Sequence, residues 1–240
     1  MLPGRVCATD RPSVLVLQHG HLGPPAILGD WLREHGLSTI VHRADGEAQL
    51  PEPDGFAFVA SLGWQRSPRD AEDALVRREL ELLRSCVERG VPVLGLCFGG
   101  QALATVLGGE VKVMSEPELG WHRLETDASE LVAEGPWLQW HYESFTTPPG
   151  ADELARSATG PQAFRAGPHL GVQFHPESTA AIVAQWARKD RDRLPRPLEK
   201  YLAELETGSL RHGQQAVEAA HRLFDGFWCG RDYNGGVTCA

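Results

Sequence analysis

One cysteine in this sequence is placed as a catalytic nucleophile would be. Cys97 follows the short apolar run at residues 91–96 and is followed at once by Phe98-Gly99-Gly100 and a helix-compatible segment. Such a strand–turn–helix lifts the side chain at the turn away from the sheet, and flanking glycines permit the turn because a Cβ would collide with nearby backbone. The N-terminus of the following helix stabilises negative charge on a thiol or an oxyanion. The pattern predicts a nucleophile elbow at Cys97, with a buried cysteine closing a core strand as the alternative.

A thiol nucleophile needs a base within hydrogen-bond reach, and the base needs a group that orients it. His175-Pro176-Glu177 offers an imidazole and a carboxylate two positions apart, with a proline to stiffen the turn between them. Considered alone, His175 is typical of a partly buried polar side chain at the end of a strand, and Glu177 is typical of a residue next to a helix N-cap. Together with a cysteine elbow, the pair reads as base and orienting acid.

The elements that must position these residues alternate between strands and helices. Apolar runs at residues 13–18, 37–42, 56–61 and 91–96 predict parallel strands, and residues 170–174 predict a late one. We expect one helix to open at the prolines before residue 26 and to stop at Gly36. A second is expected from the capping residue Ser67 to Gly90. The pattern predicts an α/β fold with an open, mostly parallel (mixed) central sheet flanked by helices. Ligand sites in such sheets form outside the carboxyl ends of the strands, where Gly63, Cys97 and His175 are expected.

The second half of the chain predicts short antiparallel strands and then helices. Segments 111–114, 121–125, 137–141 and 164–166 are short and separated by turn-rich pieces, and a helix is expected over 179–189. Two amphipathic stretches, 198–206 and 214–228, predict two further helices. We therefore expect a domain over residues 1–190 and a C-terminal helical extension, 191–240, packed on the same domain and ending in a frayed tail.

Composition excludes several classes of protein. The chain is 42% hydrophobic and 23% charged, with a formal net charge of −9 and no dense basic cluster, which argues against a nucleic-acid partner. No apolar stretch approaches the length of a membrane span, and no leader-like segment opens the sequence. Five scattered cysteines without a C-x-x-C pair favour a reduced, cytoplasmic protein rather than a zinc-finger or disulfide framework.

The two motifs together resemble a known family. Residues 95–101 (GLCFGGQ) and 171–178 (GVQFHPES) are similar to the class I (triad-type) glutamine amidotransferases, as are residues 102–109 and 140–145. The similarity runs from about residue 14 to residue 178, and the helical end resembles stand-alone, GMP-synthase-glutaminase-like members more loosely. The resemblance implies a flavodoxin-like fold and a Cys97–His175–Glu177 triad that needs no cofactor and no metal.

The resemblance also implies a mechanism. Cys97 would attack the side-chain amide carbon of glutamine, His175 would pass the thiol proton to departing ammonia, and Glu177 would orient His175. Water would then release glutamate from the thioester. The backbone N–H groups of Phe98 and Gly63 would hold the oxyanion.

Three further positions match substrate-binding segments of the family, namely Gln101, His141 and Tyr142. The alternatives to substrate binding are that Gln101 lies on the surface of a helix and that Tyr142 is an aromatic residue of the core. Many members carry histidine where this chain has Gly100, a departure that bears on substrate fit rather than on the triad. His19 and His21 follow the end of a predicted strand and could be metal ligands. Because the sequence offers no third ligand at a suitable spacing, we expect them in the wall of the pocket or on the surface.

Several functions remain open at this point. Dienelactone-hydrolase-like enzymes also carry a Gly-x-Cys-x-Gly-Gly elbow, but they place the acid before the histidine. Because no synthase domain follows the motifs, ammonia is expected to pass to a separate synthase subunit. Hydrolysis of γ-glutamyl amide or peptide conjugates would use the same triad. The role of a non-catalytic subunit is less favoured because all three triad residue types are present.

Overall fold

The central feature of the fold is an eight-stranded mixed sheet. The computed structural model describes residues 12–229 except residues 47 and 71, and its main sheet has the strand order β2-β1-β3-β4-β10-β9-β8-β6. Strands β2, β1, β3, β4 and β10 run parallel, whereas β9, β8 and β6 extend the sheet antiparallel. The bounds are β1 (Ser13–Gln18), β2 (Ser38–Arg43), β3 (Phe56–Ser61), β4 (Val93–Leu96), β6 (Glu125–Thr126), β8 (Asp152–Ser157), β9 (Gly160–Ala166) and β10 (His169–Val172). The predicted α/β architecture with an open, mostly parallel sheet is confirmed.

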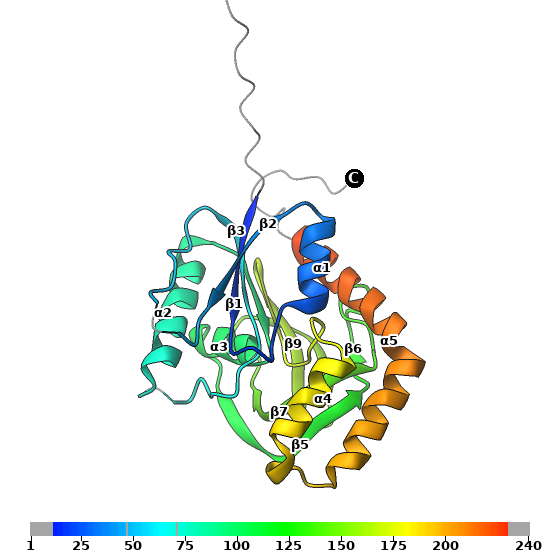
Figure 1. Cartoon of the computed structure of the whole chain (residues 1–240). Coiled ribbons are helices and arrows are strands. Elements are labelled where there is room, and N and C mark those ends of the chain that lie inside the picture. The colour runs from blue at the N-terminus through cyan, green and yellow to red at the C-terminus, as the bar shows by residue number, and fades with distance from the viewer. Residues whose placement is uncertain (1–11, 47, 71, 230–240) are drawn as a thin grey trace, which may run out of the picture.

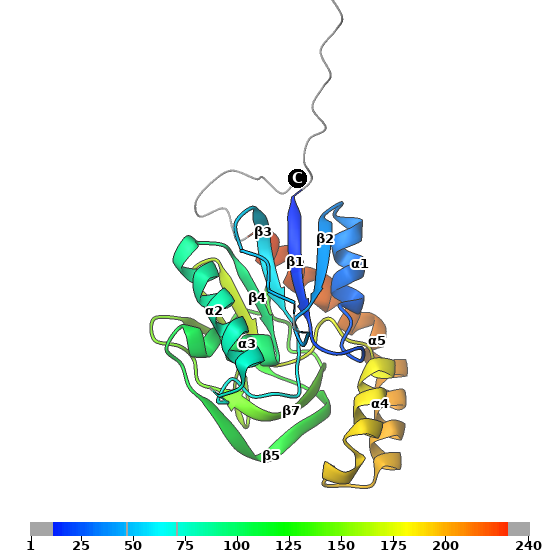
Figure 2. The same cartoon turned by 60° about the vertical axis from the view of Figure 1, so that its left-hand side comes forward.

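Helices cover both faces of this sheet. Figures 1 and 2 show α2 (Ala74–Arg89) and α3 (Phe98–Val106) on one side, with α1 (Ala26–Glu34) and the second half of α5 (Leu198–Cys229) on the other. Alternate strand residues divide between these layers because successive side chains of a strand point to opposite faces. Val14 and Val16 pack toward α1 and α5, and Leu15 and Leu17 pack toward α2 and α3. The sheet is therefore buried on both faces, as its continuous apolar runs predict.

A smaller two-stranded sheet lies beyond the carboxyl ends of the parallel strands. It pairs β5 (Val111–His122) with β7 (Trp137–Phe145) in antiparallel register, and α4 (Ala180–Lys189) packs against it with the first half of α5. A short 3-10 turn, η1 (Arg191–Arg193), joins the two helices. This layer closes one side of the region where Cys97 and His175 are expected.

The beginning of the second helix is not where the sequence predicts it. Ser67 was expected to cap it, but α2 begins at Ala74, and the cap is Asp73, whose Oδ1 accepts from the N–H groups of Leu75 (2.9 Å) and Val76 (3.3 Å). The Ser67 hydroxyl instead donates to Glu143 Oε2 on β7 at 2.6 Å. The predicted end at Gly90 is confirmed, with Gly90 in the left-handed region at φ 71°. The residues between β3 and α2 thus form a loop tied to the smaller sheet.

Two other expectations are wrong in detail. The segment expected as a strand at 111–114 is the start of the long strand β5, which continues to His122 and whose pairing with β7 shifts register between Val113 and Glu118. The segment expected at 121–125 is divided between the end of β5 and Glu125, the first residue of β6. Strand β8 was not predicted, because its sequence is mostly polar and shows no apolar alternation.

The two helices predicted at the C-terminus are one helix. Residues 207–213, which separate the two predicted helices, lie inside α5, where Gly208 packs against the Trp121 indole; an added Cβ would lie 2.2 Å from Trp121 Cδ1. Glycine here permits close packing instead of ending the helix. Further along, Leu223, Phe224 and Phe227 enter the same core cluster as Val14. The boundary at residue 190 stays a prediction, and the tail expected to fray (230–240) lies outside the described residues.

The oxidation state of the cysteines differs from the expectation at one position. Among the described cysteines, Cys86 and Cys97 are free thiols, whereas Cys229 is disulfide-bonded. The expectation of a reduced chain is therefore wrong at Cys229. No helix within the described residues combines the length and apolarity that crossing a bilayer requires.

The packing of α5 predicts opposite effects for two glycine-to-alanine substitutions. Gly208→Ala should lower the free energy of unfolding by about 1–3 kcal/mol, because its methyl group overpacks the Trp121 contact. Gly213→Ala, on the same helix, meets only the flexible Ser209 hydroxyl at 3.4 Å and should stabilise the protein by up to ~1 kcal/mol through helix propensity. Chemical denaturation of both variants measures this difference. Equal effects at the two positions would contradict the packing described for Gly208.

Candidate active site

Cys97 lies at a strained turn between β4 and α3. Its backbone adopts φ 53° and ψ −107°, a conformation that L-residues rarely take. The turn is possible because the glycines around it approach other backbone segments closely. A Cβ on Gly95 would lie 2.4 Å from the Gly99 carbonyl oxygen, and one on Gly99 would lie 2.0 Å from the Ser61 carbonyl oxygen. The predicted elbow is therefore present in the fold.

His175 and Glu177 form a buried pair just after β10. His175 Nδ1 lies 2.8 Å from Glu177 Oε1, and both side chains are only 3% exposed. Backbone bonds fix the segment: the His175 N–H donates to the Leu138 carbonyl, and the Ile27 N–H donates to the Glu177 carbonyl, each at 2.9 Å. The carboxylate thus sets the tautomer and the orientation of the imidazole, and Nε2 has no hydrogen bond to any of the described residues.

The structure brings His175 and Cys97 to one cavity of about 230 Å³, with Glu177 bonded to the imidazole. Gly63 joins them: a Cβ there would lie 2.9 Å from His175 Cε1 and 3.7 Å from the Cys97 Cβ. The Trp186 ring on α4 packs against the other side of the imidazole, with ring centroids 4.7 Å apart. The three residues predicted to form the triad therefore converge, although Cys97 is far from the others in the chain.

Electrostatics favours the protonated form of His175. Burial alone would lower its pKa, but the Glu177 carboxylate and the interaction with Cys97 outweigh burial and raise the pKa to about 10. An imidazolium beside a thiol is the arrangement that supports a nucleophilic sulfur and later supplies a proton to a leaving group.

Gln173 is a site residue that the sequence analysis missed. Its Nε2 donates toward the Cys97 Sγ at 3.8 Å, and its Oε1 accepts from Gln101 Nε2 at 3.2 Å. The signal that could have found it was its place in the 171–178 motif, two positions before His175 and directly after the end of β10.

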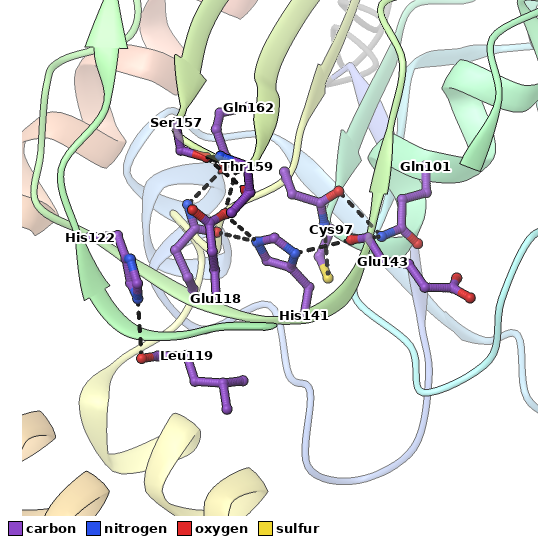
Figure 3. Close-up of polar contacts among 12 residues, drawn as sticks. Cys97, Gln101, Glu118, Leu119, His122, His141, Glu143, Ser157, Thr159 and Gln162 are labelled. Atoms are coloured by element: carbon purple, nitrogen blue, oxygen red, sulfur yellow. Dashed lines mark hydrogen bonds and ion pairs between the residues drawn. The ribbon is translucent and has the colours of Figure 1, made fainter. Parts of the chain in front are cut away.

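Gln101 lies at the edge of the site, as predicted, and links it to β7. Its Nε2 donates to the Glu143 carbonyl at 3.0 Å as well as to Gln173 (Figure 3). It lines a second cavity of about 200 Å³ that also reaches Cys97 and includes Tyr142 and Glu143. Gly100, in contrast, faces the sheet: a Cβ there would lie 2.4 Å from the Val172 carbonyl oxygen. A larger side chain at this position would require the backbone to move.

His141 lines the second cavity and is buried in a chain of polar side chains (Figure 3). Its Nδ1 lies 3.0 Å from the Glu143 carbonyl oxygen, and its Nε2 lies 3.0 Å from Gln139 Oε1 and 3.2 Å from Glu118 Oε2. Burial lowers the pKa of His141. Burial would raise the pKa of Glu118, but His141 outweighs it and lowers that pKa to about 2. With both nitrogens engaged, His141 supports the wall through Glu143.

Tyr142 lies on the open side of the second cavity. The Arg193 guanidinium stacks over its ring, with Cζ 4.2 Å from the centroid, and burial raises the pKa of the phenol to about 12. The hydroxyl group is buried and has no hydrogen-bond partner in the described part of the chain. A role for Tyr142 in substrate binding stays a prediction.

The two candidate oxyanion donors lie next to Cys97. Phe98 is the first residue of α3, where backbone N–H groups have no partner within the helix. Gly63 lies directly against Cys97 and His175. Their assignment as oxyanion donors stays a prediction that this placement favours.

His19 and His21 also border the first cavity, as wall and surface. His19 is buried and contacts Glu79, whereas His21 contacts the Arg43 guanidinium on the exposed side. Within the described part of the chain, no three His, Cys, Asp or Glu side chains gather closely enough to hold a metal ion.

Comparison with known proteins gives the family. Residues 30–183 match the family model of the class-I glutamine amidotransferases, which covers more than half of the chain. The chain belongs to this family. It is 35% identical over 186 residues to a glutamine-hydrolysing GMP synthase from Aeropyrum pernix, covering 70% of this chain but only 33% of that protein. It is 37% identical over 160 residues to a glutamine-hydrolysing GMP synthase subunit from Ignicoccus hospitalis, covering 60% of this chain and 82% of that one.

Solved structures agree with this assignment. A glutamine amidotransferase from Methylobacillus flagellatus superposes with a TM-score of 0.81 at 26% identity, covering 97% of this chain and all of that one. Another, from Thermotoga maritima, has a TM-score of 0.77 at 23% identity, covering 91% of this chain and 99% of that one, and supports the fold.

The buried pair predicts a pH-dependent stability for this amidotransferase. The pKa of His175 in the folded state, about 10, lies above its ordinary value of 6.5. The associated stability is therefore fully present below pH 6.5 and is lost as the pH rises through about 10. Glu177→Gln removes the charge that raises this pKa. The variant should lose more than about 1 kcal/mol at pH 6, and the deficit should shrink toward pH 10.

Denaturant titrations at several pH values between 6 and 10 measure this deficit. Glu204→Gln is the control: Arg196 lowers the pKa of Glu204, so the contribution of Glu204 is constant between pH 6 and 10 and is lost only as the pH falls into the acid range. A deficit for Glu177→Gln that stayed constant across this range would contradict the ion pair.

Proposed function

We propose that this chain hydrolyses the side-chain amide of glutamine to glutamate and ammonia. The observation that carries the proposal is that Cys97, at a strained elbow, lines the same cavity as His175, whose ring is hydrogen-bonded to Glu177. A nucleophile, a base and an orienting carboxylate in this order form the arrangement used for covalent acyl transfer.

In the proposed reaction, the Cys97 sulfur attacks the amide carbon and the oxygen of the amide becomes an oxyanion. The backbone N–H groups of Phe98 and Gly63 stabilise it, and each such donor is worth roughly 3 kcal/mol in the transition state. His175 gives its proton to the nitrogen, the C–N bond breaks, and ammonia leaves behind a γ-glutamyl thioester. Water then attacks the thioester with His175 as base, so glutamate is released and the thiol is restored. Glu177 keeps the imidazole oriented throughout.

The second cavity is the proposed place for the amino-acid end of glutamine. It is lined by polar side chains, among them Gln101, Tyr142 and Glu143, that can hydrogen-bond an ammonium and a carboxylate. Gln101 and Tyr142 would contact the substrate, and His141 would act through the Glu143 backbone.

We further propose that the ammonia is used by a separate synthase. The relative from Ignicoccus hospitalis is named as one subunit of a GMP synthase, a name that supports such a division of labour. A cytoplasmic location fits a catalytic thiol that must stay reduced and is likewise a proposal.

A second candidate function is hydrolysis of γ-glutamyl amide or peptide conjugates. It is favoured by the first cavity, which lies on the His175 side of Cys97 and is bordered by Trp64, Trp140 and Trp186. This space would accommodate a leaving group larger than ammonia.

The central test is substitution of the nucleophile. Cys97→Ala should reduce glutamate and ammonia release from glutamine by at least about a thousandfold, because no other group can form the thioester. Cys86→Ala is the matched control: Cys86 is the other free thiol of the described chain, a buried residue of α2 whose pKa is raised to about 12 by burial. That variant should keep its activity within about threefold. Equal rates in wild type and Cys97→Ala would contradict the proposal.

The substrate is tested by comparing kcat/KM for glutamine with values for γ-glutamyl amines and γ-glutamyl peptides on the isolated chain. The primary proposal expects glutamine to be the best of these substrates. Turnover of conjugates alone would reject glutamine in favour of the second function.

A further inference from the structure

A second group of buried polar side chains lies behind the wall of the first cavity, outside the triad. Glu79, on α2, is 1% exposed, and its two carboxylate oxygens accept from the Ser61 hydroxyl and from His19 Nε2, each at 2.6 Å. The His19 side chain is fully buried, and this is the only hydrogen bond of its ring among the described residues. The carboxylate thus joins the ends of β1 and β3 to α2.

Stability of the fold does not explain why a carboxylate is buried at Glu79. The neighbouring buried positions of α2 are apolar (Val76, Leu82 and Leu83), and an apolar residue in place of Glu79 would continue the pattern. Burying a carboxylate with polar partners is weak support for stability, because the cost of desolvation offsets most of the attraction. The position of Glu79 and His19, next to the loop that carries Gly63, points to a role in the active site instead.

His19 supports the loop that follows β3. The Leu62 N–H still donates to Leu17 in the sheet at 3.1 Å, but Gly63 and Trp64 lie beyond the paired residues of β3. The Trp64 indole stacks on the His19 ring, with centroids 4.4 Å apart and planes inclined by 15°. The loop is thus held at Trp64, one residue after the proposed oxyanion donor Gly63.

The same cluster reaches the other oxyanion donor. The Phe98 ring meets His19 and Trp64 edge-on, with centroid distances of 5.3 and 5.2 Å. Gly99 packs directly on the backbone of Ser61, the residue whose hydroxyl binds Glu79. Both sides of the oxyanion hole therefore rest on one platform fixed by Glu79.

We propose that Glu79 and His19 are positioning residues that hold the backbone N–H groups of Gly63 and Phe98 at the spacing an oxyanion requires. This rests on the proposed function. A carboxylate suits the role because both of its partners donate hydrogen bonds. An amide would place an N–H against one of these donors and shift the His19 ring, and displacement of a catalytic donor by about 1 Å is enough to slow a reaction strongly.

The test compares two reactions of Cys97 in Glu79→Gln. Hydrolysis of glutamine passes through an oxyanion, whereas alkylation of Cys97 by iodoacetamide displaces iodide at a saturated carbon and builds none. The variant should lose about 10- to 100-fold in kcat, with KM within about threefold of wild type. Its rate of Cys97 alkylation should stay within about twofold.

His19→Gln is a second variant, useful because it keeps a donor for Glu79 and leaves no unpaired buried carboxylate. It removes the ring under Trp64 and should show the same division between the two reactions. Asp225→Asn is the matched control, since Asp225 accepts a hydrogen bond from Trp31 on the α1–α5 side of the molecule at 2.8 Å. That variant should match wild type in both reactions.

Two results would overturn the inference: unchanged hydrolysis in both cluster variants, or a parallel fall in hydrolysis and alkylation, which would mean that the cluster supports the triad or the fold as a whole. If Glu79→Gln does not fold, His19→Gln alone decides between these outcomes. A wild-type chain without Cys97-dependent hydrolysis would refute the proposed function itself, a result distinct from an active wild type with active cluster variants.

Discussion

The backbone turn at Cys97 is the constraint on which the rest of the site depends. A non-glycine residue at φ 53° and ψ −107° costs on the order of 1–3 kcal/mol, so the surroundings must hold it there. They do so by packing backbone on backbone: Gly95 on Gly99, Gly99 on Ser61, and Gly100 on Val172. These contacts fix α3 against β3 and β10, the strands that deliver Gly63 and His175. The glycines of the motif therefore fix the strands that carry Gly63 and His175 relative to Cys97, as well as permitting the turn.

Around this turn, three sets of buried residues support the site. On the β10 side, Glu177 orients His175 and Trp186 closes over it. On the β3 side, Glu79 and His19 support the loop carrying Gly63. A third set, Glu118 and His141, supports the Glu143 backbone to which Gln101 is bonded (Figure 3). Each set places a buried carboxylate next to a histidine, so the wall of the site is built from ion-paired or hydrogen-bonded rings rather than from apolar packing alone.

The sequence predicts the parts of this arrangement whose residues are close together in the chain, and misses those formed by residues that are far apart. Cys97 and the pair of His175 and Glu177 were predictable because each motif is local, and the strand pattern placed both at the same edge of the sheet. Glu79 was not, since it lies on an ordinary amphipathic helix and meets His19 60 residues away. Gln173 carried a signal in its place in the motif, two positions before His175. The fold shows the same division: β1 and β3 were predicted with their observed bounds, whereas the start of α2 and the continuity of α5 depend on the tertiary contacts of Ser67 with Glu143 and of Gly208 with Trp121.

The most direct test of the central claim is to trap the acyl intermediate on the elbow. Wild-type protein would be mixed with glutamine, quenched in acid within the first turnovers, and examined by intact-mass and peptide mass spectrometry. We expect a γ-glutamyl thioester confined to the peptide that contains Cys97 and absent from Cys97→Ala. Glutamine hydrolysis with no adduct on Cys97, or with an adduct on another residue, would contradict the account.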